Sequence, residues 1–146
     1  METKMAADEL FLHRWFEEVW NRGSQDAIDE MVATDVRIQG LTDVEGNDVR
    51  GIDNFKLFHE NFRNAFPDLR VTVEDVLCDG DKMAARCRII QTHTGDGLGI
   101  SPTNAPIEFS GMCIVRLENG KIAEAWNNFD FLSMYQQMGL IGNPVT

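Results

Sequence analysis

The stretch GKIAEAWNNFD, residues 120–130, has the pattern of the last strand of a sheet that runs into a helix. Successive side chains of a strand point to opposite faces, so its residues sort into two rows. One row holds Ile122, Glu124 and Trp126, and the other holds Ala123, Ala125 and Asn127. The small alanines would leave room for a ligand. We therefore predict that their row faces the inside of the fold, with Asn127 at its end.

From residue 69 onward, hydrophobic residues recur at every second position over most of the chain, which is the period of a strand. The predicted strands are RVTVEDVL (70–77), KMAARCRIIQTH (82–93) and APIEFSGMCIVRLE (105–118), with KIAEAWN (121–127) as the last. Arg86, Arg88 and Arg116 mark the outer face. The inner face is then predicted to carry Cys87, Ile89, Gln91 and His93 from one strand, and Gly111, Cys113, Val115 and Leu117 from the next.

Helical periodicity dominates before residue 69. It predicts a helix over 8–22, a short helix over 24–33 with Ser24 as its N-cap, a short strand over 35–41, and a helix that begins near the cap candidate Asp53 and stops before Pro67. A closing helix is expected over 129–138, with Gly139 after its end. Helices followed by an antiparallel sheet predict an α+β fold in a single domain, residues 1–146, and a curved sheet leaves a pocket in its concave face.

The composition argues against polyanionic partners. With 24 acidic and 13 basic residues the formal net charge is -11, so we expect neither nucleic acid nor a membrane surface as a partner. The three cysteines lie at wide spacings in predicted strands, where buried free thiols are expected, and they favour a reducing compartment. The first 18 residues lack the apolar run of a secretory signal, which predicts a cytoplasmic protein.

Several motifs resemble a known family. FRNAFPDLRVTVEDVL (62–77), QTHTGD (91–96), EFSG (108–111) and ENGKIAEAWNNFDFLSMYQQMG (118–139) are similar to the SnoaL-like polyketide cyclases of the nuclear-transport-factor-like fold. The resemblance implies a cone-shaped α+β barrel, with N-terminal helices packed in the concave face of a curved, mostly antiparallel sheet. It also implies a dimer and no metal or organic cofactor. Enzymes of this family close a ring by aldol chemistry, and related proteins hydroxylate, isomerise or only bind.

The family's catalytic residues carry over incompletely. Its acid/base carboxylate, at the end of the last strand, corresponds here to Asn127, and a histidine of the preceding strand corresponds to Cys113. The histidine of the TH-x-G segment does match, as His93. Asparagine can hold a carbonyl by a hydrogen bond but cannot accept a proton at neutral pH. The resemblance therefore supports the scaffold better than the ring-closing reaction.

His93 and Asp130 are the candidate catalytic residues. His93 is predicted to face inward and has a pKa range suited to proton transfer, or it is a core histidine satisfied by a backbone group or by Asp130. Asp130 could support the reaction, but its position at a helix start favours a structural role. Asp35 occupies the region where ketosteroid-isomerase-like relatives carry their base, and nothing local supports it.

The candidate binding residues come from several elements. Asn127 and Gln91 would orient a carbonyl, and Trp15 would form a pocket wall. His59 lies on the stripe of phenylalanines in its helix, where a structural role is favoured over a binding one. Cys113 faces inward without a base in sequence reach, so packing is favoured over nucleophilic attack.

Two functions remain open at this point. The chain either binds a small apolar or aromatic molecule and runs cofactor-free cyclase, isomerase or hydrolase chemistry on it, or it is a non-catalytic binding or assembly module. No spacing of ligands predicts a metal site, and GDGLG is not a dinucleotide loop because Pro102 and a strand follow it. The outer row of Met112, Ile114, Ile122 and Trp126 predicts a homodimer through the outer sheet face.

Overall fold

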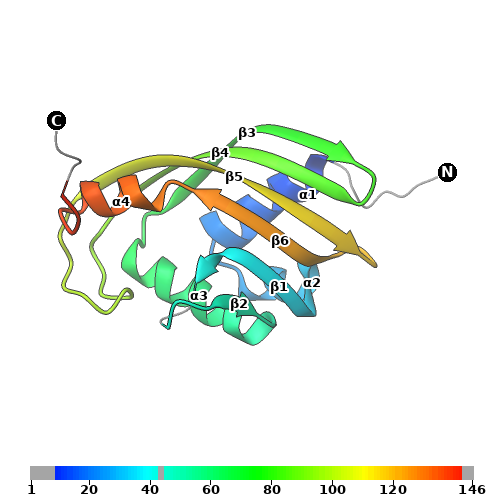
Figure 1. Cartoon of the computed structure of the whole chain (residues 1–146), viewed down its shortest axis with the longest axis horizontal. Coiled ribbons are helices and arrows are strands. Elements are labelled where there is room, and N and C mark those ends of the chain that lie inside the picture. The colour runs from blue at the N-terminus through cyan, green and yellow to red at the C-terminus, as the bar shows by residue number, and fades with distance from the viewer. Residues whose placement is uncertain (1–8, 43–44, 143–146) are drawn as a thin grey trace.

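The described strands form one curved sheet that wraps over the helices (Figure 1). A computed structural model of the chain describes residues 9–42 and 45–142. The strands are β1 (Val32–Thr42), β2 (Asp48–Arg50), β3 (Arg70–Asp79), β4 (Lys82–Thr92), β5 (Pro106–Glu118) and β6 (Lys121–Phe129), in the order β2-β1-β6-β5-β4-β3. β1 pairs in parallel with β6, and the other pairs are antiparallel. The mostly antiparallel α+β fold expected from the sequence is confirmed.

Most of the helices lie on the concave side of this sheet, and the C-terminal one lies at one end of it (Figure 1). The helices are α1 (Glu9–Arg14), the π-helix η1 (Trp15–Asn21), α2 (Gln25–Met31), α3 (Ile52–Ala65) and α4 (Phe131–Gln137). Ser24 caps α2 as expected, since its side chain accepts a hydrogen bond from the Ala27 amide at 3.1 Å. The prediction for Asp53 was wrong: Gly51 is the N-cap of α3 and Asp53 lies in the first turn. The predicted start of the first helix at residue 8 lies outside the described residues.

The last strand departs from simple alternation. Leu117 pairs with Ile122 whereas Arg116 pairs with Glu124, so one extra residue, Ala123, is inserted as a β-bulge. The bulge turns Ile122 inward, where it is only 1% exposed, and keeps Ala125 inward as well. The predicted outward position of Ile122 was therefore wrong.

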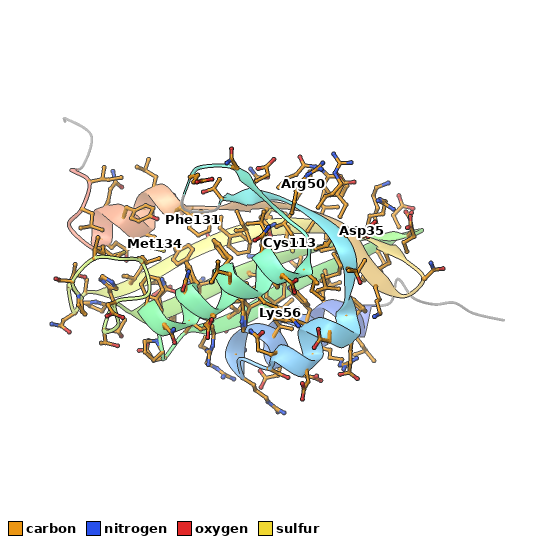
Figure 2. The ribbon with its side chains drawn as sticks, turned by 90° about the horizontal axis from the view of Figure 1, so that it is seen from below. Asp35, Arg50, Lys56, Cys113, Phe131 and Met134 are labelled. Carbon is orange, nitrogen blue, oxygen red and sulfur yellow. The ribbon has the colours of Figure 1, made fainter. Side chains whose placement is uncertain are left out.

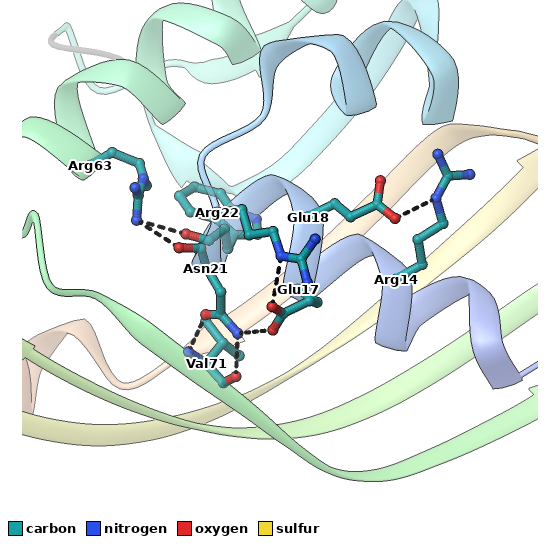
Figure 3. Close-up of polar contacts among 8 residues, drawn as sticks. Arg14, Glu17, Glu18, Asn21, Arg22, Arg63 and Val71 are labelled. Atoms are coloured by element: carbon teal, nitrogen blue, oxygen red, sulfur yellow. Dashed lines mark hydrogen bonds and ion pairs between the residues drawn. The ribbon is translucent and has the colours of Figure 1, made fainter.

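Hydrogen bonds hold the π-helix against the edge of the sheet (Figure 3). The Asn21 side-chain amide donates to the carbonyl of Val71 at 3.0 Å and accepts from the Val71 amide at 2.6 Å, which occupies the open edge of β3. Arg63 of α3 donates to the carbonyl of Trp20 at 2.9 Å at the end of the π-helix. These bonds fix η1 between α3 and β3, and with it the indoles of Trp15 and Trp20.

The glycine-rich loop over 94–104 packs directly on α3. A β-carbon on Gly97 would lie 1.9 Å from the carbonyl oxygen of Asn61, and one on Gly95 would lie 1.7 Å from that of Asn64. Only glycine permits so close an approach of two backbones. The loop composition is thereby explained by packing.

The convex face of the sheet exposes Met112 (53%) and Ile114 (44%), with the half-buried Trp126 paired to Ile114 across β5 and β6. Cys87 and Cys113 are buried free thiols as expected, whereas Cys78 is exposed, contrary to the prediction. Every helix in the described ranges is too short or too polar to span a bilayer.

Candidate functional site

An apolar cavity of about 70 Å³ lies between the concave face of the sheet and the helices. Aromatic and aliphatic side chains from the π-helix, α3, the start of α4 and five strands make up its wall. Among the residues that the structure describes, no charged side chain takes part, and the lining consists of Trp15, Phe16, Trp20, Val32, Ile38, Leu41, Phe55, Phe58, Phe62, Leu69, Val71, Ile89, Phe109, Cys113, Val115, Ile122, Ala125, Asn127, Phe129 and Phe131. A charged group placed in such a cavity would lose its hydration without a compensating charge.

Asn127 is the amide in this wall. Its Nδ2 donates to the backbone carbonyl of Gln39 on β1 at 3.0 Å, which fixes the orientation of the amide. Its Oδ1 accepts no hydrogen bond from any residue that the structure describes. β1 can approach this closely because Gly40 has no side chain: a β-carbon there would lie 1.9 Å from the Asn127 carbonyl oxygen. The free Oδ1 is therefore available to a hydrogen-bond donor in the cavity.

Cys113 faces Asn127 across the sheet, since the two residues are paired between β5 and β6 and both line the cavity. Figure 2 shows Cys113 in the middle of the sheet behind α3. Burial raises the pKa of the Cys113 thiol to about 12, so the thiol is protonated at neutral pH. It supplies neither a nucleophile nor a base under those conditions. Asn127 and Cys113 occupy the two positions where the resemblance places the cyclase carboxylate and histidine.

A larger groove of about 600 Å³ adjoins the cavity, because both are lined by Leu41, Phe58, Phe62 and Phe131. Its outer wall comes from the loop residues Gly97, Leu98 and Gly99 and from polar side chains, which are Thr42, Asn54, Asn61 and Tyr135. The groove and the cavity are therefore separated only by the four side chains that line both.

Trp15 lines the cavity and stacks on Phe55 with ring centroids 5.6 Å apart. His59 does not line it, although the side chain is buried. Its Nε2 lies 2.6 Å from the carbonyl of Val19, and its Nδ1 lies 3.0 Å from the Gln25 amide nitrogen. The Nε2 proton therefore binds the π-helix and Nδ1 accepts from Gln25. Burial lowers the pKa of His59, so both contacts belong to the neutral ring.

Gln91 and His93 are buried on the inner face of β4 and its extension, one and two inward positions beyond the cavity residue Ile89. The Thr103 amide donates to His93 Nδ1 at 3.0 Å, and this bond closes the loop over 94–104. The predicted backbone partner of His93 is thus Thr103, at the other end of the loop. Burial lowers the pKa of His93. Neither residue contributes to the cavity wall, and the catalytic role of His93 stays a prediction.

Asp130 is the N-cap of α4 and accepts from the Ser133 amide at 3.0 Å. The structural role favoured from the sequence is confirmed, and the side chain is exposed outside the cavity wall. Asp35 is exposed on β1, away from the cavity (Figure 2). Within the described ranges, no three or more His, Cys, Asp or Glu side chains are grouped to hold a metal ion.

The sequence model of the SnoaL-like polyketide cyclases matches residues 11–138. The chain belongs to this family. No curated protein sequence gives a significant match. Solved structures do: IdmH, a candidate polyketide cyclase from Streptomyces antibioticus, is 29% identical with a TM-score of 0.74, over 88% of this chain and 96% of that one.

Two further SnoaL-like structures superpose equally well. A candidate polyketide cyclase from Bacillus cereus ATCC 10987 is 28% identical with a TM-score of 0.75, over 90% of this chain and 80% of that one. AclR, a candidate hydroxylase from Streptomyces galilaeus, is 24% identical with a TM-score of 0.78, over 98% and 87%. At that identity the likeness to AclR shows the SnoaL-like fold alone.

Most of the residues that line the cavity were not predicted from the sequence. The phenylalanines of α3 at helical spacing were a visible signal, because such a stripe must face the sheet. Phe109 and Phe129 could have been found from alternation in β5 and β6. Ile122 was placed outward because alternation was counted through Glu124, whereas the three-residue spacing of Lys121 and Glu124 was the one signal of the bulge.

Proposed function

We propose that this SnoaL-like protein binds a small neutral molecule with an apolar ring in the cavity and a hydrogen-bond donor directed at Asn127. The observation that carries the proposal is the cavity wall itself: apolar side chains surround a single oriented amide, with no charged group among the lining residues. An ion would lose its hydration there without a compensating charge, which costs several kcal/mol.

Binding is favoured over turnover by the chemistry of the wall. Ring closure needs a group that takes up a proton near neutral pH, and the cavity offers Asn127, which cannot, and Cys113, whose pKa is about 12. A hydroxyl or enol group of the ligand would donate to Asn127 Oδ1. One end of its ring system would contact Trp15 and Phe55, and the rest, too large for a cavity of about 70 Å³, would lie in the adjoining groove.

Calorimetric titration with 2-naphthol and 2-naphthoate tests the proposal, because the two probes share their rings and differ in charge. We expect 2-naphthol to bind at least tenfold more tightly than the anion. Asn127→Leu should weaken 2-naphthol by about three- to tenfold, the range of one lost hydrogen bond of about 1 kcal/mol. Equal or tighter binding of the anion would refute an uncharged site.

A further inference from the structure

Three buried polar atoms on β4 and its extension have no partner among the described residues. They are Nε2 and Oε1 of Gln91 and Nε2 of His93. Gln91 is 1% exposed and His93 is fully buried. Buried polar side chains are almost always hydrogen-bonded, since leaving one unpaired costs about 1–3 kcal/mol. Two such side chains at adjacent inward positions indicate a group that binds them both.

The tautomer of His93 decides what that group must offer. The Thr103 amide donates to Nδ1, so Nδ1 carries the lone pair and the proton of the neutral ring is on Nε2. His93 therefore presents an N–H donor, and Gln91 presents both a donor and an acceptor. A hydroxyl oxygen meets these requirements, because it accepts from His93 and donates to Gln91 Oε1.

The spacing also suits a single oxygen. Residues two apart on one face of a strand lie about 6.6 Å apart along it. An oxygen that forms hydrogen bonds of about 2.9 Å to both side chains spans about 5.8 Å when it lies between them. The backbone ladder continues to His93, whose amide donates to the Ala105 carbonyl at 3.1 Å, so this strand spacing holds at both residues.

The pair adjoins one end of the cavity. Ile89 precedes Gln91 by two residues on the inner face of β4 and pairs with Phe109 of β5, and both line the cavity. Leu69, the residue before β3, lines it too, and the next residue, Arg70, pairs with Ile90 of β4. On the far side the ring of Phe66 lies 5.5 Å from that of His93. A ligand group that passed Ile89 and Phe109 would meet Gln91 first.

We propose that Gln91 and His93 form a buried subsite for one neutral hydroxyl oxygen, provided by a water molecule in the free protein and by a hydroxyl group of the ligand in the complex. The ligand half of this proposal rests on the proposed binding function, and the water half does not. In the subsite, His93 Nε2 donates a hydrogen bond to the oxygen. Gln91 Oε1 accepts one from it, so the bound group must carry a hydroxyl proton.

A crystal structure of the ligand-free protein at a resolution that shows ordered waters tests the water half. We expect an oxygen within hydrogen-bond distance of His93 Nε2 and of a side-chain atom of Gln91. In the Gln91→Met protein, whose new side chain has the same unbranched length, the oxygen should be lost. A direct hydrogen bond between Gln91 and His93, or no oxygen in the wild type, overturns it.

Calorimetric titration with phenol and benzene tests the ligand half. We expect the wild type to prefer phenol by at least about threefold, and Gln91→Met to reduce that preference while benzene binding stays the same. Ile107→Met is the matched control, since Ile107 is the buried cross-strand neighbour of Gln91, and it should leave the preference unchanged. An unchanged preference in Gln91→Met, or no binding of either probe, overturns the ligand half and leaves the crystallographic result standing.

Discussion

A substitution that fills the cavity tests two things separately: how much stability the empty space costs, and whether the cavity binds a ligand. Ala125 lines the cavity and is 6% exposed, so Ala125→Leu directs three added carbons into a space of about 70 Å³. At about 24 cal/mol per Å³, the empty space costs the folded state about 1.7 kcal/mol, which the substitution can recover by filling it. We expect the free energy of unfolding to stay the same or rise by up to about 1.7 kcal/mol.

The matched control is Ala85→Leu. Ala85 lies on the inner face of β4, 1% exposed and paired with Cys113, but it is not in the cavity wall. Leucine there has no space to enter, and overpacking costs about 1–3 kcal/mol. Urea unfolding should therefore rank Ala125→Leu above Ala85→Leu by at least about 1 kcal/mol, with similar m-values.

The same two proteins test ligand binding. Ala125→Leu should abolish 2-naphthol binding although it is the more stable variant, and Ala85→Leu should retain binding below its unfolding temperature. The reasoning is refuted if the two substitutions destabilise the protein equally. It is also refuted if Ala125→Leu binds 2-naphthol like the wild type, because the probe would then lie elsewhere.

Three further outcomes follow from the geometry. Burial lowers the pKa of His59 and His93, so below about pH 6.5 the unfolded chain binds more protons than the folded one, and stability should fall as pH decreases from 7 to 5. In urea unfolding, the stability of His93→Gln should fall less steeply with decreasing pH than that of the wild type. An identical slope would contradict the assignment of the pH dependence to the histidines. Asn127→Asp places a carboxyl beside the Gln39 carbonyl in an uncharged wall. The pKa of this carboxyl should rise in the folded state. The loss in free energy of unfolding relative to the wild type should therefore grow above pH 4, by up to about 1.4 kcal/mol per pH unit. A loss that stays constant with pH would contradict the raised pKa. Ring closure of an aromatic polyketide ester by this variant would show that the wild type has lost that reaction. Ile114→Glu should convert a dimer of twice 16.5 kDa into a monomer by light scattering, and a wild-type monomer at micromolar concentration would refute the dimer.

Strand faces were predictable wherever a charged residue marked the outside. Arg86 and Arg88 fix the alternation of β4, and the inward positions of Cys87 and Gln91 follow from them. In β6 the charged residues Lys121 and Glu124 are three positions apart, so simple alternation cannot place both on the outside, and the bulge at Ala123 turns Ile122 inward. A bulge depends on pairing with a neighbouring strand, which local alternation does not encode.

The hydrogen-bond partners of the histidines were not predictable either, for a different reason. His59 is held by the carbonyl of Val19, which the π-helix turns toward α3, and His93 is held by Thr103 across a ten-residue separation. Neither partner lies within the window in which helical or strand periods are read. The helical stripe that placed His59 beside Phe55 gave its face correctly, but the face did not show that both ring nitrogens already have partners.

The orientation of Asn127 gives the site a preference that residue type alone does not. One of its amide protons is engaged by the Gln39 carbonyl, which turns Oδ1 away from β1. A ligand with a hydroxyl or enol proton can then bond to Oδ1, whereas a ketone must rely on the second amide proton. Because the thiol of Cys113 opposite is neutral, nothing in the wall would remove the proton that the ligand donates. Under the proposed binding function, an amide therefore holds a hydrogen-bond donor at the position where the resemblance places a carboxyl for proton transfer.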